Sequence, residues 1–377
     1  MDQDNSKTLN QAQIRHLLTV MGGPAGSTLS PLTRERFPEE GDPSERLMLE
    51  EGLIDPKGGL CEPWNQVFQS LSRPSLEIIA AVGFPEGRKS LCGYGSFGDM
   101  EKLVGFTPLN ETEYRIVYPL SKDPFLSLLV VDLGLDLETP VLGVETEMDL
   151  ETLLTLAGMI DAGREAQMEA MLARESEPDR EVRFDRILYN TRKGLTSNDY
   201  RWLASAIRNL IPFEVTITQK TILSGLKELQ KIGWVEKTGE KMWLFTETFD
   251  IPRKHFESLI NFGILSIQRH NQEGIERIHL GILRTLGSLW ILDFKDQDGD
   301  KPTVWVGTAY GPGLAQALDR VVEATLQGVP QPEELVGQSF PQEGGLSTVL
   351  PKKSFCGKCG APAQPEDRFC INCGNKL

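Results

Sequence analysis

The chain has 377 residues, of which 40% are hydrophobic and 25% are charged, and its formal net charge is −15. These values are typical of a soluble globular protein, and the length predicts two ordinary domains with a small appendage. The acidic surplus argues against a protein whose main task is to hold a nucleic acid, because phosphate backbones require a concentrated basic surface.

The acidic residues are concentrated in one part of the sequence. Between Asp132 and Asp185 there are fifteen Asp or Glu residues against four Arg and no Lys. The rest of the chain is nearly neutral, so a modest basic face elsewhere remains open. The N-terminus is polar, and no apolar run reaches the roughly 18 residues that would span a bilayer. We therefore expect a cytoplasmic protein without membrane insertion.

The first part of the chain is predicted to begin with helices and to continue with strands. Apolar residues at helical spacing predict a helix from Thr8 to Val20, with Ser6 as its cap. A second helix is predicted from Ser44 to Glu51, ending at Gly52, and turn residues predict a tight hairpin in residues 53–60. Runs rich in Ile, Val and Tyr predict strands at Leu76–Val82, Arg88–Tyr94, Tyr114–Pro119 and Phe125–Leu133.

A long amphipathic helix is predicted from Met148 to about Glu175, followed by an acidic linker up to Glu181. Its apolar stripe includes Leu150, Met168 and Met171, and its other face is acidic. A stripe of this kind is most often part of a core, although an exposed Met-rich face also suits adaptable binding of a partner.

The next block, from Leu195 to about Leu326, repeats the plan of the first. A helix opening at Leu195 is followed by a helix from Thr218 to Lys231, and superposing Gly233 on Gly52 also places Gly239 on Gly58. The predicted elements that follow are a hairpin (Trp234–Phe245), four strands (Ile264–Arg269, Ile275–Leu283, Ser288–Phe294, Thr303–Thr308) and a closing helix (Pro312–Leu326). Internal duplication is therefore a hypothesis to test.

The pattern predicts an α+β fold with two similar halves, each with helices and a mostly antiparallel sheet, plus a small C-terminal zinc ribbon. The predicted segments are an N-terminal α+β half (1–146), an amphipathic acidic helix and linker (147–181), a C-terminal α+β half (182–326), a flexible tether (327–354) and the zinc ribbon (355–377).

Two CxxC-Gly motifs at the C-terminus predict one structural zinc ion with the ligands Cys356, Cys359, Cys370 and Cys373. Each motif presents two thiolates to the metal, and a module this small needs the metal in order to fold. Redox activity is the competing interpretation, but neither motif has the βαβ context of a thiol oxidoreductase. With four protein ligands, the zinc has no open position for catalysis.

Nothing else in the sequence has the pattern of a catalytic centre, so we expect no enzyme activity. The histidines, His16, His255, His270 and His279, lie in no metal or nucleophile spacing. The remaining cysteines, Cys61 and Cys92, are expected to be free, buried thiols. The run Asp296–Asp300 is expected to form a hairpin turn, because a calcium loop built on Gly299 would misplace two ligands.

A winged helix is the second candidate motif, in Thr216–Thr246. The predicted inner face of its helix is Ile222, Leu223, Leu226, Leu229 and Ile232. DNA binding there would require one exposed face to carry Lys220, Lys227, Lys231, Lys237 and Lys241. No arginine is available for base contacts, and winged helices also bind proteins, so both functions stay open.

The block Leu47–Glu77 resembles the opening of EspG proteins, which are cytosolic chaperones of type VII (ESX) secretion. In that family, a helix, Gly-Leu, Gly, a second helix and Leu-x-Arg-Pro lead into the first strand, as Leu71-Ser-Arg-Pro74 does here. The later runs Leu289–Phe294 and Val304–Thr308 resemble that family's closing strands.

The resemblance covers roughly residues 8–326 and implies a quasi-symmetric α+β protein that binds helical secretion substrates without catalysis. The zinc ribbon departs from the family's plan. The sequence thus favours a non-catalytic cytosolic chaperone or adaptor that binds an apolar helical segment of a protein partner, as in type VII secretion. The alternative is a winged-helix DNA-associated regulator with a zinc-ribbon tail.

Overall fold

The computed structural model describes residues 6–23, 27–35, 37, 43–95, 102–174, 181–271, 274–295 and 302–327, and the backbone of 354–355 and 362–363. The chain divides into two compact units, Met1–Val336 and Gly337–Leu377. The first unit contains an antiparallel sheet of ten strands in the order β1-β5-β4-β3-β2-β10-β11-β12-β13-β6. A smaller sheet has the order β7-β9-β8.

The elements of the first half run from β1 to α5. They are β1 (Ser6–Asn10), α1 (Gln11–Val20), α2 (Pro31–Arg34), α3 (Glu45–Glu50), α4 (Trp64–Ser72), β2 (Leu76–Phe84), β3 (Gly87–Gly95), β4 (Leu103–Pro108), β5 (Glu113–Leu120) and α5 (Asp123–Leu133).

The elements of the second half run from β6 to α11. They are β6 (Glu145–Asp149), α6 (Leu150–Ala173), β7 (Val182–Arg183), α7 (Phe184–Thr196), α8 (Leu203–Leu210), α9 (Gln219–Lys231), β8 (Val235–Lys237), β9 (Met242–Phe245), the 3-10 helix η1 (Glu247–Phe249), α10 (Asp250–Glu257), β10 (Leu259–Asn271), β11 (Gly274–Thr285), β12 (Leu289–Lys295), β13 (Thr303–Ala309) and α11 (Gly311–Leu326).

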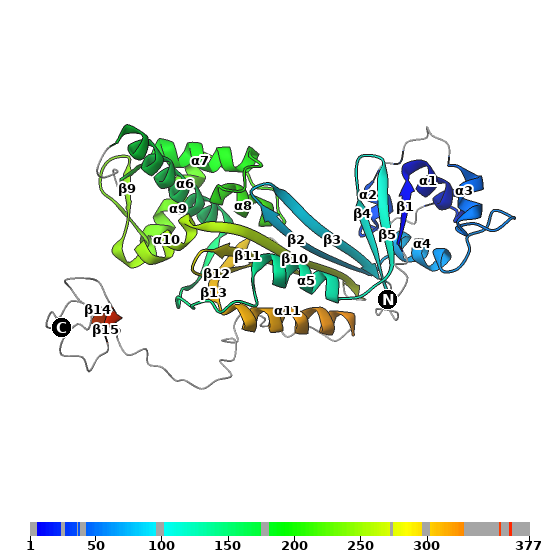
Figure 1. Ribbon diagram of the computed structural model, residues 1–377. Coiled ribbons are helices and arrows are strands. Elements are labelled where there is room, and N and C mark those ends of the chain that lie inside the picture. Colours follow the sequence, from blue (N-terminus) through cyan, green and yellow to red (C-terminus); the bar gives the residue numbers. More distant parts are fainter. Residues whose placement is uncertain are drawn as a thin grey trace. The chain divides into compact units, whose positions relative to one another are not determined.

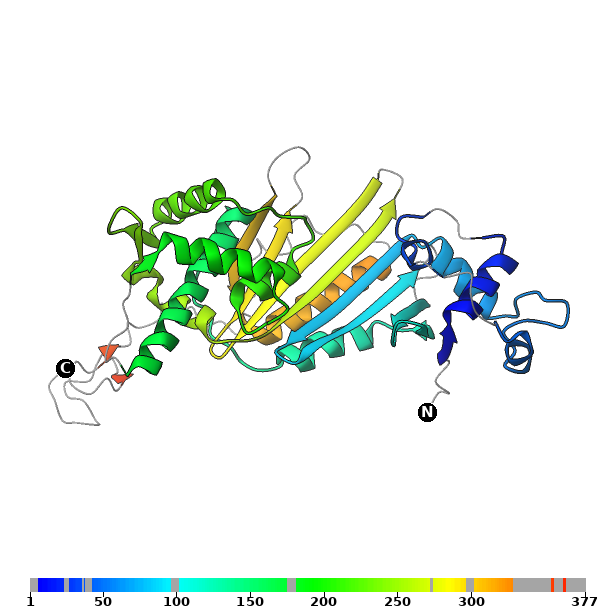
Figure 2. The ribbon, with the colours of Figure 1, turned by 90° about the horizontal axis from the view of Figure 1, so that it is seen from above.

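The two halves share one order of elements. Each begins with an edge strand and a helix, β1-α1 or β6-α6, and each ends with four strands and a helix. The prediction of an α+β fold with two similar halves is confirmed, and the strands of both halves join in a single sheet (Figure 2). The junction is the antiparallel pair β2–β10, with a continuous register from Leu76↔Arg269 to Gly83↔Phe262.

Gly52 and Gly233, which the sequence comparison superposed, occupy equivalent positions in the two halves. Gly52 follows α3 and Gly233 follows α9, with φ angles of 68° and 80°. Glycine adopts this left-handed conformation without the steric penalty that a Cβ brings, so it suits the end of a helix. Each glycine then leads into a hairpin, closed by the bridge Ile54↔Leu60 or by the pair β8–β9.

Helices cover both faces of the ten-stranded sheet. α5 and α11 lie on one face, and α6 to α10 lie on the other face over the second half (Figure 1). α5 spans the junction, because Phe125 lies over Gly93 of β3 and Leu133 lies over Gly263 of β10. Lys122, at the start of α5, donates to Asp319 and Glu323 of α11 at 2.9 and 2.5 Å.

The segment Phe125–Leu133, predicted as a strand, is the helix α5, which is a correction. Its Phe and Val residues favour strands, but Pro124 in the first turn and Gly134 after the last turn support a helix. The predicted helix from Thr8 begins only at Gln11, because Asn10 caps it and residues 6–10 pair with β5. The strands β4 and β6 have no counterpart among the predicted strands.

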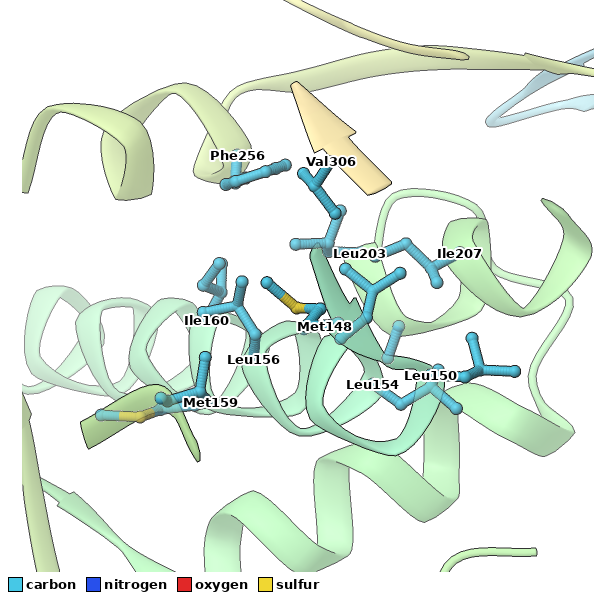
Figure 3. Packing of buried hydrophobic residues seen from close by; sticks show 14 of the residues in the cluster. Met148, Leu150, Leu154, Leu156, Met159, Ile160, Leu203, Ile207, Phe256 and Val306 are labelled. Carbon is cyan, nitrogen blue, oxygen red and sulfur yellow. The ribbon is translucent and has the colours of Figure 1, made fainter. Parts of the chain in front are cut away.

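The second half is built around α6, whose first part is buried on all sides. Its residues from Leu150 to Ala162 pack against α8, α10 and β13 in one hydrophobic cluster (Figure 3). The neighbouring helix α8 has no capping side chain of its own. Asp161 of α6 caps it instead, because its carboxylate accepts from the backbone N–H groups of Leu203 and Ala204 at 2.9 and 2.8 Å.

We expect Asp161→Asn to remove one component of the pH dependence of stability. Burial raises the pKa of Asp161 from 3.8 to about 6, although the two backbone N–H groups favour the ionised carboxylate. The folded state therefore binds this proton more tightly than the unfolded state. Stability from this group falls by on the order of 3 kcal/mol as the pH rises from about 4 to about 6.

Urea unfolding of both proteins across this pH range measures the effect. The difference in free energy of unfolding, wild type minus Asp161→Asn, is expected to decrease as the pH rises. All other titrating groups are shared and cancel in the difference. Parallel pH profiles for the two proteins would contradict the assignment.

Candidate protein-binding surface

The helix α6 begins with a capping interaction and continues through the core. Asp149 Oδ1 accepts from the backbone N–H of Thr152 at 2.6 Å, which satisfies one of the free donors of the first turn. Leu150 and Met159 are 2% and 0% exposed, so neither is accessible to a partner. The part of the predicted stripe that Leu150 represents therefore belongs to the core.

The C-terminal part of α6 leaves the core and exposes large apolar side chains. Met168, Met171 and Leu172 are 47%, 78% and 85% exposed. Their spacing of i, i+3 and i+4 places them on one side of the helix. We call this set the α6 tip. Exposed apolar side chains that form a stripe are more informative than isolated ones, because they match the contact surface of a helix that packs against another helix.

Another side of the same helical segment faces the strands β7 and β9 of the same chain. Ala162, Ala166, Ala170 and Ala173 line a shallow cavity of about 340 Å³ whose opposite wall includes Val182 of β7 and Met242 of β9. The small alanines permit close approach of these strands. Arg186 Nη1 closes the rim by an ion pair with Glu169 Oε2 at 2.7 Å, and the pKa of Arg186 is raised chiefly by this hydrogen bond.

The lysines predicted for a nucleic-acid surface are all exposed. Lys220, Lys227 and Lys231 follow one another at i, i+7 and i+11 on α9, which places them on one helix face. Lys237 and Lys241 line a groove together with the first turn of α9. Lys231 pairs with Glu228 at 3.3 Å, whereas the other four have no ion pair within the described part of the chain.

The predicted inner face of α9 needs a correction. Ile222, Leu226 and Leu229 are 0% exposed, but Leu223 and Ile232 are 44% and 39% exposed. The three buried residues follow the spacing i, i+4 and i+7, which defines a single face. Leu223 and Ile232 lie about 100° and 80° to either side of Ile222, so they fall on the flanks of the helix.

The histidines and the two isolated cysteines do not form a reactive cluster. In the described ranges, no group of three or more His, Cys, Asp or Glu residues is placed to hold a metal ion. Cys61 and Cys92 are free, as predicted, but they are half-buried and not fully buried. Burial raises the pKa of Cys92 to about 11, which disfavours its thiolate at neutral pH. The absence of enzyme activity stays a prediction.

Two further predictions fall on residues outside the described part. The predicted hairpin turn at residues 296–300 is one of these predictions. The described strands on either side of it, β12 and β13, pair antiparallel. The four predicted zinc ligands also lie outside the described residues. Two described pieces of backbone flank the first CxxC motif in the sequence: β14 (Ser354–Phe355) pairs antiparallel with β15 (Pro362–Ala363). Among the described helices, none is long and apolar enough to cross a membrane.

Comparisons with known proteins identify the C-terminal segment. A family model of the zinc-ribbon domain matches residues 355–377, which supports zinc binding by this segment. No curated protein matches the chain. One similar solved structure is the Mycobacterium tuberculosis type VII secretion system chaperone EspG5, in complex with the PE25-PPE41 dimer. The similarity covers 87% of this chain and 98% of that chain, with 12% sequence identity and a TM-score of 0.45.

We expect the α6 tip to contribute little to folding. Replacing Met171 and Leu172 by Ser should change the free energy of unfolding by no more than about 0.5 kcal/mol each, because neither side chain packs in the core. Met159→Ala should cost about 2–5 kcal/mol, because it opens a cavity in a packed cluster. Urea denaturation followed by circular dichroism measures all three variants. A large loss of stability at Met171 or Leu172 would show that the tip serves the fold.

Proposed function

We propose that the chain is a non-catalytic, cytosolic binding protein that acts as a chaperone or adaptor for a helical segment of a protein partner. The observation that carries this proposal is the α6 tip, where Met168, Met171 and Leu172 are 47%, 78% and 85% exposed. An apolar partner helix can cover such a stripe with its own i, i+3 and i+4 positions. Met side chains adapt to differing partner surfaces, which suits a protein that holds a client.

The rest of the second half supports this role by holding the tip rigidly. Residues 150–162 anchor α6 in the core, so the last turns project from a fixed base. A preorganised surface loses less conformational freedom on binding than a mobile one. The resemblance of residues 47–77 to the opening of EspG proteins favours a type VII secretion client as the partner.

We further propose that Cys356, Cys359, Cys370 and Cys373 hold one structural zinc ion. The zinc-ribbon match over residues 355–377 includes all four thiols, and four thiolates satisfy the tetrahedral preference of zinc. The ribbon then serves as a separate binding module attached through residues 327–354.

The alternative function is a winged-helix DNA-associated regulator. The observations that favour it are the strand order β7-β9-β8 beside α9 and the exposed lysines of α9 and the β8–β9 hairpin. Two features weigh against it. α9 carries no arginine for bidentate contacts with guanine, and the exposed Leu223 interrupts its polar surface.

A photo-crosslinking amino acid in place of Met171 tests the chaperone role in the native cytoplasm. We expect a specific adduct with a helical protein, identified by mass spectrometry, because residue 171 lies within the proposed contact. The matched control places the same amino acid at Val131 of α5, which is 70% exposed. The same adduct from both positions, or none from position 171, would contradict a docking role for the tip.

Zinc content gives a second test. We expect one zinc per chain in the purified protein by elemental analysis, and loss of that zinc in Cys370→Ser but not in Cys61→Ser. The thermal midpoint of the large unit should not change in Cys370→Ser, because Cys370 belongs to the separate compact unit Gly337–Leu377. Zinc retained by Cys370→Ser would refute the proposed ligands.

A further inference from the structure

A groove on the second half is distinct from the α6 tip. It lies between the first turns of α7 and α9 and the β8–β9 hairpin, and its volume is about 430 Å³. That volume admits one or two side chains of a partner, but not a folded domain.

The floor of the groove is apolar. Leu188 and Trp243 are 9% and 4% exposed, Phe184 is half-buried, and Leu223 is 44% exposed. Leu223 lies on the flank of α9 beside this floor, so its exposed surface belongs to the groove. An apolar side chain inserted here would remove Leu223 and Phe184 from water together, which favours binding.

The rim of the groove is basic. Lys237 and Lys241 line it from the hairpin, and Lys220 lies in the same first turn of α9 as the lining residue Gln219. None of the three has an ion pair within the described residues. Asp185 does not neutralise the rim, because its carboxylate accepts from Arg183 Nε and Nη2 at 2.9 and 3.0 Å. Glu240 is the remaining carboxylate in the lining.

We propose that this groove binds an acidic segment of a partner protein that carries one bulky apolar side chain. The apolar side chain lies between Leu223 and Trp243, and flanking carboxylates pair with Lys237 and Lys241. Charge complementarity selects an acidic segment, and the apolar floor selects a peptide over DNA. A duplex offers its phosphates to the lysines but brings no apolar side chain to the floor.

Selection of random peptides displayed on phage against the intact protein tests this proposal. We expect enrichment of acidic peptides with one Phe, Leu or Trp. Binding of the enriched peptides, measured by fluorescence anisotropy, should weaken at least about tenfold in Leu223→Ser and in the double variant Lys237→Glu and Lys241→Glu. Lys57→Glu reverses the charge of another exposed lysine, in the first half, and should leave the affinity unchanged.

Two results would overturn the proposal. One is enriched peptides whose affinity is the same in the wild type and in the groove variants. The other is a mixed-sequence DNA duplex that binds more tightly than any peptide and loses affinity in the same variants. Circular dichroism checks that each variant is folded, which is expected because the three changed residues are exposed. The tip variants Met171→Ser and Leu172→Ser should bind the peptides normally. Failure of the groove proposal can therefore be distinguished from failure of the α6-tip proposal.

Discussion

The pairing of β2 with β10 is the constraint on which the rest of the structure depends. The strands hydrogen-bond from Leu76↔Arg269 to Gly83↔Phe262, and each half supplies one of them. Without this pair, each half would expose a long, apolar strand edge, which promotes association with other chains. The helix α5 reinforces the junction, because Asn261 Nδ2 of β10 donates to the carbonyl oxygen of Asp132 at 2.6 Å.

A duplicated plan does not give the halves equivalent surfaces. In the first half a ten-residue helix, α1, follows the edge strand, whereas in the second half the corresponding helix α6 has 24 residues. The extra length carries α6 out of the core and leaves the tip exposed. The helices α7 and α8 accompany this longer helix, and β7 and α7 together with α9 and its hairpin form the groove. The α6 tip thus belongs to the part in which the halves differ, whereas the groove combines β7 and α7 with α9 and its hairpin, which have counterparts in the first half.

Burial distinguishes an exposed methionine of the α6 tip from a buried methionine of the same helix. Met159 and Met168 lie on one helix, yet one is fully buried and the other is half exposed. The presence of methionine at both positions does not reveal this difference. The sequence does mark the side of α6 that faces β7 and β9, by the alanines at 162, 166, 170 and 173. Small residues at this spacing permit close packing of neighbouring strands.

The sequence by itself determined the features that depend on neighbouring residues. These include the strands β8 to β13 of the second half, the helix ends at Gly52 and Gly233, and the cysteine spacing that the zinc-ribbon match covers. Only the tertiary structure decided that the halves share one sheet and that Asp161 caps α8 from 42 positions away. The physical reason is that a helix-ending glycine or a tight turn acts within a few residues, whereas burial, strand pairing and a cap such as that from Asp161 depend on partners distant in the chain.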